Sequence, residues 1–290
     1  MRSEESAREL HPSEKSLPNY VRIGFEYATG REIPASLKKV IGGASLLDAS
    51  ILTVDDALDD SMYRAGRLCL HRQVGVMPAV LHAVVMSTQA IDALTEAMTL
   101  AGTPVDCQVL IYQVMNSFVQ DAYGGAILEL ELRKLTDFHP LMLEHYVRMI
   151  HAITGLHVKA GVECGQLLGG RRPDATVSRA AKALGVIRQV LDDFDDYFDE
   201  HHEPFGDIKG GLNRLPEILF KRMGGSRDQV LRALEAGRTE EARALVLNDK
   251  VRGEMHEFCV AETSKIRVEG VPLALSSLVG DIGAILSRRA

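Results

Sequence analysis

The sequence is poor in aromatic residues and contains no tryptophan. Phe, Trp and Tyr together make up 5% of the 290 residues, whereas hydrophobic residues of all kinds make up 46%. A chain of this length and composition can bury one large core or two smaller ones. The core must therefore be packed mainly from Leu, Ala, Val and Ile.

Cysteine is scarce as well, and its spacing argues against a structural zinc site and a disulfide framework. No two cysteines form a C-x-x-C pair, because the four lie far apart at Cys69, Cys107, Cys164 and Cys259. The N-terminal stretch MRSEESARELHPSEKS is charged throughout, so we expect no secretory signal. We therefore predict a reduced, cytoplasmic protein.

An excess of positive charge and long apolar runs are also missing. The net charge of −7 and the pI near 5.8 argue against a nucleic-acid partner. No apolar run approaches the roughly 20 residues that span a bilayer, so we expect no stable insertion into a membrane.

Apolar residues recur at spacings of three and four along most of the chain, which is the period of an α-helix. Alternating runs typical of strands are lacking. Residues 1–18 are polar and are expected to form a flexible N-terminal segment, and residues 19–290 a single all-α domain. Helices are expected at 35–60, 74–101, 105–133, 140–169 and 176–199, and shorter ones at 213–223, 226–236, 239–248, 250–266 and 271–287.

Two clusters of aspartates follow apolar helical stretches. The first contains Asp55, Asp56, Asp59 and Asp60, and the second contains Asp192, Asp193, Asp195 and Asp196. Residues four apart share a helix face, so each cluster places two carboxylates side by side. Such carboxylates repel one another unless cations lie between them.

Oxygen ligands one helical turn apart suit Mg²⁺, which binds through one or two carboxylates together with water and substrate phosphates. Two clusters that face each other across a cavity would clamp a diphosphate through metal ions and assist its departure from carbon. A solvated acidic helix end is a sufficient explanation for one cluster. It explains two D-D-x-x-D clusters poorly.

These motifs resemble those of the trans-prenyl diphosphate synthases, or polyprenyl synthetases, of the all-α isoprenoid synthase superfamily, of which the chain looks like a divergent member. The family's D-D-x-x-D-x-x-x-x-R-R-G corresponds to residues 55–66, where Arg64 is kept. The family's F-Q-x-x-D-D-x-x-D corresponds to 188–196. G-x-D-L-x-x-G-K-x-T-L-P corresponds to 206–216, which lacks one residue early in the motif and then keeps register through to Leu215-Pro216. The resemblance covers most of residues 20–220.

The resemblance implies a bundle of long helices around a central cavity, a homodimer, and three Mg²⁺ ions that bind an allylic prenyl diphosphate. The catalytic, metal-binding residues it implies are Asp55, Asp56, Asp59, Asp192, Asp193 and Asp196. Those expected to bind the diphosphate are Arg64, Arg188, Gln189 and Arg214. Ser50 and Ile51 would line the pocket for the prenyl tail, and a serine there favours a C15 or C20 chain.

The family's site for isopentenyl diphosphate is largely absent. Its basic loop is reduced to Arg31 and Pro34. Asp48 stands where the family has His or Gln, and Ala65 stands where it has the second Arg. Each lost contact is a charge-assisted hydrogen bond worth about 1.5–3 kcal/mol.

The allylic side has changed too. Ile153-Thr154 replaces the family's K-T pair, Leu212 replaces a Lys, and Arg214 replaces a Thr. Arg188 lies one turn before Asp192 and is expected either to pair with it or to bind the diphosphate. Glu129 is a possible proton acceptor or a surface residue, and the run 200–202 (Glu-His-His) is expected to be solvated loop rather than a metal site.

We therefore predict a Mg²⁺-dependent enzyme that ionises an allylic prenyl diphosphate and transfers the prenyl group to an unknown acceptor other than isopentenyl diphosphate. One alternative is a terpene cyclase derived from a prenyl diphosphate synthase. Another is an ordinary chain-elongating synthase. A non-catalytic partner subunit is disfavoured, because a scaffold has no need of eight repelling carboxylates.

Overall fold

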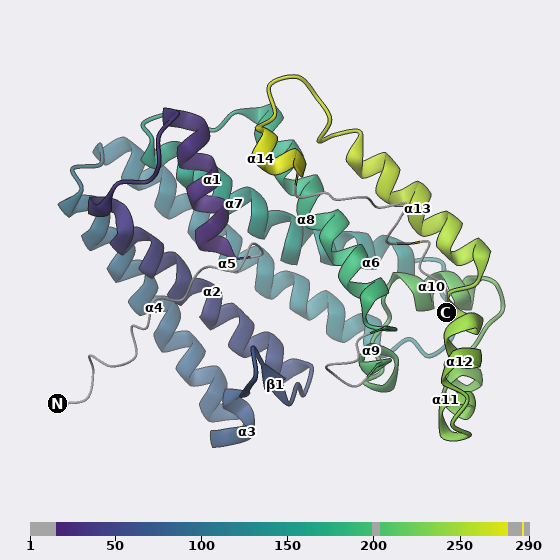
Figure 1. Cartoon of the computed structure of the whole chain (residues 1–290). Coiled ribbons are helices and arrows are strands. Elements are labelled where there is room, and N and C mark those ends of the chain that lie inside the picture. Colours follow the sequence, from purple (N-terminus) through teal and green to yellow (C-terminus); the bar gives the residue numbers. More distant parts are fainter. Residues whose placement is uncertain (1–15, 199–203, 278–285, 287–290) are drawn as a thin grey trace.

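The chain folds into a bundle of helices in which α8 runs through the middle (Figure 1). The computed structural model describes residues 16–198, 204–277 and 286. The prediction of an all-α fold is confirmed. The longer helices are α1 (Leu17–Thr29), α2 (Lys38–Leu58), α4 (Val76–Leu100), α5 (Val105–Arg133), α7 (Leu156–Leu168), α8 (Ala175–Asp195) and α13 (Asp249–Thr263). The shorter ones are α3 (Leu70–Val74), α6 (Met142–Ile150), α9 (Gly206–Lys209), α10 (Leu215–Arg222), α11 (Arg227–Glu235), α12 (Thr239–Val246) and α14 (Leu273–Ser276).

Helix α1 was not among the predicted helices, and it begins inside the segment expected to be flexible. Leu17 is fully buried and opens the helix, with Pro18 in its first turn, where a proline costs no hydrogen bond. Helix α1 therefore includes the last two residues of the segment that was expected to be flexible. Residues 1–15 lie outside the described part of the chain.

Helix α1 packs backbone to backbone against α7. A side chain at Gly165 would overlap the carbonyl oxygen of Val21, and one at Gly24 would overlap the carbonyl oxygen of Val162. Only glycine permits so close an approach. This contact fixes α1 along α7, and α1 also contacts α2.

A short hairpin follows α2 and departs from the purely helical expectation. Strands β1 (Tyr63–Arg64) and β2 (Arg67–Leu68) pair through a turn at Ala65 and Gly66, both of which have positive φ angles. Two central residues of this kind form the tight turns that suit hairpins. The hairpin reverses the chain, so that Arg64 lies beside the end of α2.

The single helix expected over 140–169 is interrupted by a π-helical turn, His151–Gly155. The turn packs against α8 at Gly185, where any side chain would overlap the carbonyl oxygen of Thr154. Inserted π-turns of this kind often mark functional sites. Here the turn separates α6 from α7 and places Thr154 against the second aspartate motif's helix.

Buried apolar side chains form two groups. One surrounds α8 and includes α6 and the helices α10–α13, and the other lies between α1, α2, α4, α5 and α7. Helix α2, which ends at the first aspartate motif, belongs to the second group. Helix α8, which ends at the second motif, belongs to the first. The two motifs therefore meet where the two groups join.

Helix α4 packs along α2 but leaves its other face open. By length and composition it could cross a membrane, although only 17% of its apolar window is buried in this structure. The expectation that no segment is long and apolar enough is therefore wrong. No Asp, Glu, Lys or Arg occurs between Val76 and Ile91, so scattered uncharged polar residues hid the helix's apolar character.

Candidate active site

The first aspartate motif lies at the C-terminal end of α2. Arg64 reaches back from the hairpin: its Nε donates to Asp56 Oδ1 at 2.8 Å, and its Nη2 lies 3.3 Å from Asp55 Oδ2. Burial, followed by the charge of Glu129, raises the pKa of Asp55. A helix C-terminus already carries negative partial charge, so carboxylates there need cations nearby. Asp60 turns outward and pairs with Arg72 at 2.7 Å.

The second motif lies at the C-terminal end of α8. Asp193 is only 2% exposed and accepts hydrogen bonds from the Tyr146 hydroxyl and from Gln189 Nε2, the latter at 2.8 Å. Burial raises its pKa to about 6. Gln189 also accepts a hydrogen bond from Thr154 Oγ1 at 3.3 Å. Gln189 therefore holds the motif's second aspartate in place.

Arg214, at the start of α10, lies between the two motifs. Its Nη2 is 3.9 Å from Asp59 Oδ2 in the first motif, and its Nε is 4.0 Å from Asp193 Oδ1 in the second. Two further carboxylates are closer, Glu129 at 3.1 Å and Asp207 at 3.3 Å. The structure thus brings both motifs to one buried guanidinium. Glu129 is buried and faces the site, so the surface-residue alternative for it is wrong.

Several carboxylates of the site have raised pKa values because they are buried beside one another. Burial, and then Asp55 and Glu129, raise the pKa of Asp59 to about 7. Burial, and then Asp207 and Glu217, raise that of Asp196 to about 8. In this part of the chain, negative charge exceeds the positive charge that the protein supplies.

This donor set fits a hard divalent cation. Within the described residues, no three His, Cys, Asp or Glu side chains converge closely enough to form a complete metal cage. Mg²⁺ needs no such cage, since it keeps several waters and binds through one or two carboxylates plus phosphate oxygens. The excess of carboxylates at the two helix ends meets that requirement. Residues Glu200, His201 and His202 lie outside the described residues.

Arg188 points toward α1. Its Nη1 donates to the hydroxyl of Tyr20, and its guanidinium lies 5.8 Å from the centre of the Tyr20 ring. Burial raises the pKa of Tyr20 to about 12, Arg188 opposes this rise, and Asp192 adds to it. Arg188 is thus held in place by an aromatic residue of α1, which sequence reasoning could not foresee.

Where the family holds isopentenyl diphosphate, this chain places an acid–base pair. Asp48 Oδ1 lies 3.0 Å from His157 Nε2, and Asp48 Oδ2 accepts the backbone N–H of Leu17 at 3.3 Å. The imidazole ring stacks on Phe118 and meets Tyr20 edge-on, with ring centroids 5.5 and 5.6 Å apart. Arg31 and Pro34, the remnants of the basic loop, are exposed to solvent.

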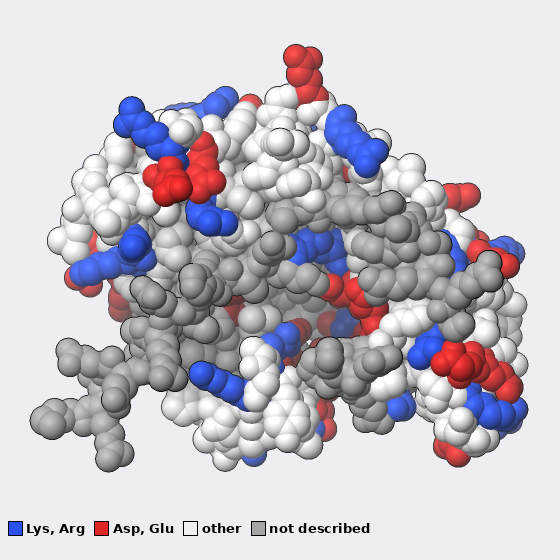
Figure 2. All heavy atoms as spheres, in the orientation of Figure 1, with Lys and Arg blue, Asp and Glu red and all other residues white. Residues whose placement is uncertain are grey.

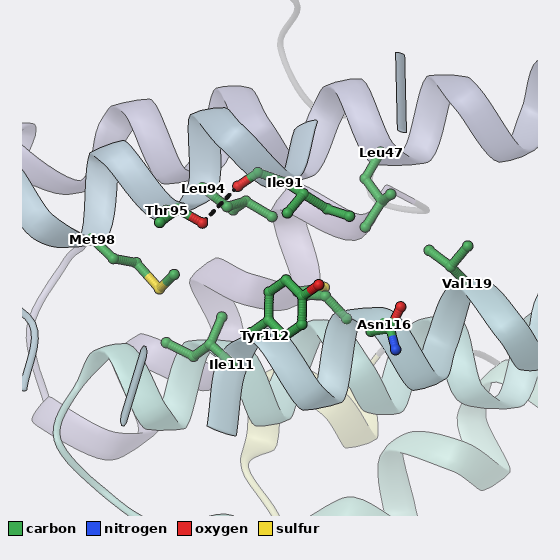
Figure 3. Close-up of a pocket in the computed structure, with 10 residues that line it drawn as sticks. Leu47, Ile91, Leu94, Thr95, Met98, Ile111, Tyr112, Asn116 and Val119 are labelled. Atoms are coloured by element: carbon green, nitrogen blue, oxygen red, sulfur yellow. Dashed lines mark hydrogen bonds between the residues drawn. The ribbon is translucent and has the colours of Figure 1, made fainter. Parts of the chain in front are cut away.

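An apolar pocket lies beside α2, between α4 and α5 (Figure 3). Leu47 enters it from α2 and Tyr112 stands upright in it from α5. The other lining residues are Ile91, Leu94, Thr95, Met98, Ile111, Met115, Asn116 and Val119. Ser50 does not line it: its hydroxyl donates to the Leu47 carbonyl at 2.7 Å and accepts from Ser87 at 2.9 Å.

Sequence reasoning missed four residues of this region: Arg133, Tyr146, His157 and Asp207. Arg133 lies between Asp59 and Glu129, with its Nη2 3.2 Å from Glu129 Oε1. The available signal for Asp207 was its place in the tail motif after the second cluster. The other three belong to helices whose sequence carries no motif, so only the fold reveals them.

Figure 2 shows acidic and basic side chains together around a hollow in this face, over the meeting point of α5, α8 and α9.

Solved structures with the same arrangement of helices define the class. Geranylgeranyl pyrophosphate synthetase from Pyrococcus horikoshii matches with a TM-score of 0.75 at 20% identity, covering 95% of this chain and 86% of that one. A geranylgeranyl pyrophosphate synthase from Corynebacterium glutamicum, in complex with isoprenyl diphosphate and magnesium, matches with a TM-score of 0.72 at 19% identity, covering 97% and 88%. The fold is that of the isoprenoid synthases.

The sequence places the chain within that class. The model of the polyprenyl synthetase family matches residues 19–246, and the chain belongs to this family of prenyltransferases. A short chain isoprenyl diphosphate synthase from Methanothermobacter thermautotrophicus is 26% identical over 258 residues, which cover 81% of this chain and 77% of that protein. An all-trans-nonaprenyl-diphosphate synthase from Rhodobacter capsulatus is 25% identical over 250 residues, covering 82% and 73%.

Proposed function

We propose that the protein ionises an allylic prenyl diphosphate between its two aspartate motifs and transfers the prenyl group to an acceptor other than isopentenyl diphosphate. The observation that supports the first part is the convergence of both motifs on Arg214. The observation that supports the second is the pair formed by Asp48 and His157 at the family's isopentenyl position.

The diphosphate would lie between the ends of α2 and α8. Asp55, Asp56 and Asp59 would hold Mg²⁺ from one side, and Asp192, Asp193 and Asp196 from the other. When bound, Mg²⁺ neutralises the charge that develops on the leaving diphosphate. Arg64 is half-exposed at the mouth, with 47% of its side chain accessible, and it would turn to the diphosphate by giving up its hydrogen bonds to the buried Asp56. Arg188 and Gln189 would face the diphosphate from α8. Arg214, which precedes α10, would contribute its positive charge from the buried side of the site.

The prenyl tail would extend from the first motif along α2 toward the apolar pocket, which in this structure has room for about one water molecule and would have to open to receive the tail. Leu47, two turns before Asp55 on that helix, enters the pocket, whereas Ser50 is turned to α4. Tyr112 stands across the pocket from α5 and would limit the length of the tail. Tyr112 rather than Ser50 would therefore set the limit, and the C15 or C20 substrate stays a prediction.

A second diphosphate would be poorly accommodated at the acceptor position. The carboxylate of Asp48 would repel it, and any positive charge on His157 is already matched by that carboxylate at 3.0 Å. An uncharged acceptor meets no such penalty. A carbon–carbon double bond within the prenyl chain is one such acceptor, which is the cyclase alternative.

Chain elongation with isopentenyl diphosphate is the second candidate. It is favoured by the two curated relatives at 25–26% identity, both of which are named as diphosphate synthases. The two candidates differ in one measurable respect, which is whether isopentenyl diphosphate is consumed.

We also infer that two copies of the chain pair through α4 and α5. The outward face of α4 exposes Met77, Leu81 and Val84 by 68%, 60% and 52% of their surfaces, and α5 adds Val105 and Val109. Monomeric proteins rarely leave large apolar patches uncovered. A second copy offers the same uncharged face, as a two-fold interface requires.

A product assay tests the proposal. Geranyl, farnesyl and geranylgeranyl diphosphates are each incubated with the protein and Mg²⁺, with and without isopentenyl diphosphate, and the products are identified by mass spectrometry. We expect diphosphate release from a C15 or C20 substrate, with the prenyl cation captured by water as a linear alcohol because no acceptor is supplied, and no elongated product. A cyclic hydrocarbon or cyclic alcohol from one substrate alone would establish the cyclase. Elongation that requires isopentenyl diphosphate would refute the proposed acceptor, and no release from any substrate would refute ionisation itself.

A further inference from the structure

Arg214 is held in a fixed position by residues that have no part in the proposed chemistry. It precedes α10 in an extended conformation and is only 9% exposed. The neighbouring Asn213 donates to the carbonyl of Leu135 at 3.1 Å, beyond the end of α5. Lys221 donates to Asn213 Oδ1 at 2.7 Å. The backbone on which Arg214 stands is therefore tied to the helix that carries Glu129.

The guanidinium of Arg214 contacts carboxylates from four separate elements. Glu129 comes from α5 and Asp207 from α9, and both lie within 3.3 Å of it. Asp59, at the end of α2, and Asp193, in α8, lie within 4.0 Å. These elements belong to both apolar groups of the core, so the guanidinium spans the junction between them.

The positive charge at this junction is nevertheless too small to neutralise the carboxylates around it. Four carboxylates surround Arg214, and Arg133 is the second guanidinium among them, in contact with Asp59 and Glu129. Burial disfavours the charged form of Arg214, yet Asp207, Glu129 and the two motif aspartates raise its pKa well above the ordinary value. An arginine here is thus strongly favoured as a cation. Without Arg214, buried carboxylates from both motifs would face one another, and Arg133 would be the only guanidinium left among them.

We propose that Arg214 is a tethered cation that holds the two aspartate motifs together in the absence of metal, and that Mg²⁺ must compete with it for Asp59 and Asp193. The family has a threonine at this position, which supplies no charge. In this chain the site would therefore remain assembled without metal. Arg214 would be a positioning residue that acts through the aspartates. The inference rests on the proposed role of the motifs in binding Mg²⁺.

The test is the melting temperature of the whole chain, with and without Mg²⁺, for the wild type and Arg214→Thr. In EDTA we expect Arg214→Thr to melt well below the wild type, because repulsion between the motifs is no longer relieved. Excess Mg²⁺ should recover most of that loss, since a divalent ion can take the place of the guanidinium. The Mg²⁺-induced rise should be much smaller in the wild type.

Arg222→Thr is the matched control. Arg222 lies in α10 and pairs with the single carboxylate of Glu254, away from both motifs. Its loss should lower the melting temperature by an amount that Mg²⁺ does not recover. The tethered-cation role is wrong if Mg²⁺ fails to recover the melting temperature of Arg214→Thr, as in this control. It is also wrong if Arg214→Thr and the wild type have the same melting temperature in EDTA.

Calorimetric titration with Mg²⁺ alone gives a second readout. Arg214→Thr should bind Mg²⁺ at least about tenfold more tightly than the wild type, because the guanidinium charge within 4.0 Å of Asp59 and Asp193 no longer competes for them. Arg214→Lys keeps the charge and should resemble the wild type, and it serves the same test if Arg214→Thr does not fold. Equal or weaker Mg²⁺ binding by Arg214→Thr, or tighter binding by Arg214→Lys, would overturn the proposal. Neither the melting temperature nor the calorimetric titration requires turnover. If both give the expected results but the product assay shows no reaction, only the proposed reaction is refuted.

Discussion

The carboxylate of Asp48, which stands where the family motif has His or Gln, lies 3.0 Å from His157 Nε2. Both side chains are largely shielded from water, which strengthens their effect on a nearby anion. Under the proposed function, the carboxylate of Asp48 would disfavour a second diphosphate at the acceptor position.

Restoring the family's donors should therefore create activity with isopentenyl diphosphate. We expect Asp48→Gln combined with Ala65→Arg to raise kcat/KM for isopentenyl diphosphate by at least about tenfold, since each restored contact contributes about 1.5–3 kcal/mol. Elongated prenyl diphosphates are measured by mass spectrometry. Asp48→Asn alone removes the charge without adding the arginine and should give a smaller gain. Equal elongation by the wild type and the double variant would contradict the selectivity argument.

The aspartate motifs should be required for ionisation but not for folding. Asp55→Ala and Asp192→Ala are each expected to lower diphosphate release by at least about 100-fold, the usual effect of removing one electrostatic stabiliser. EDTA should have the same effect on the wild type. The exposed Asp92→Ala on α4 is the control. Near-normal release by both motif variants, with circular dichroism unchanged, would be incompatible with a metal clamp.

Glycines at the contact between α1 and α7 should tolerate no side chain. Gly165→Ala places a methyl group on the carbonyl of Val21, and the overpacking should cost about 1–3 kcal/mol or more. Gly253 lies in α13 with open space around it, so Gly253→Ala should instead stabilise the helix by up to about 1 kcal/mol. Urea unfolding measures both. Similar effects from the two substitutions would mean that the close contact does not form.

The buried lysine that supports Arg214 should give a pH-dependent contribution to stability. Burial, followed by the charge of Arg227, lowers the pKa of Lys221 from 10.5 to about 8. The folded protein therefore binds this proton less tightly than the unfolded chain does. The cost of the buried ammonium is fully present below the folded pKa and fades as the pH rises through 8 toward 10.5.

Lys221→Met removes that cost. Its free energy of unfolding, relative to the wild type, should thus be most favourable near neutral pH and should decline at alkaline pH. Urea titrations at about pH 7 and about pH 9.5 measure this difference. Lys39→Met, on the exposed side of α2, reports the effect of net charge alone. A relative stability of Lys221→Met that rises with pH would contradict the lowered pKa.

The sequence was informative where structure is determined locally. The helical period located most helices, and the spacing of Asp55 with Asp59 and of Asp192 with Asp196 identified both motifs, because residues four apart must share a helix face. The π-turn was not predictable, since it depends on how α8 approaches at Gly185. Long-range contacts were equally hidden.

Arg214 illustrates the difference. The tail motif marked its position and suggested diphosphate binding, but its carboxylate partners lie on four elements that only the fold brings together. The same holds for Asp48, whose partner His157 is on another helix and belongs to no motif. Sequence patterns identify reactive side chains, whereas the balance of charge around them requires the tertiary structure.

The uncharged face of α4 should hold two copies of the chain together. Leu81→Glu places a charge on that face, where burial in an interface would leave it without a partner, so we expect the variant to be a monomer. Light scattering after size exclusion gives the mass directly. Val260→Glu introduces the same charge on α13, where the residue is 50% exposed, and should leave the dimer intact. A monomeric wild type would refute the pairing, and a Leu81→Glu variant that remains dimeric would place the interface on another face.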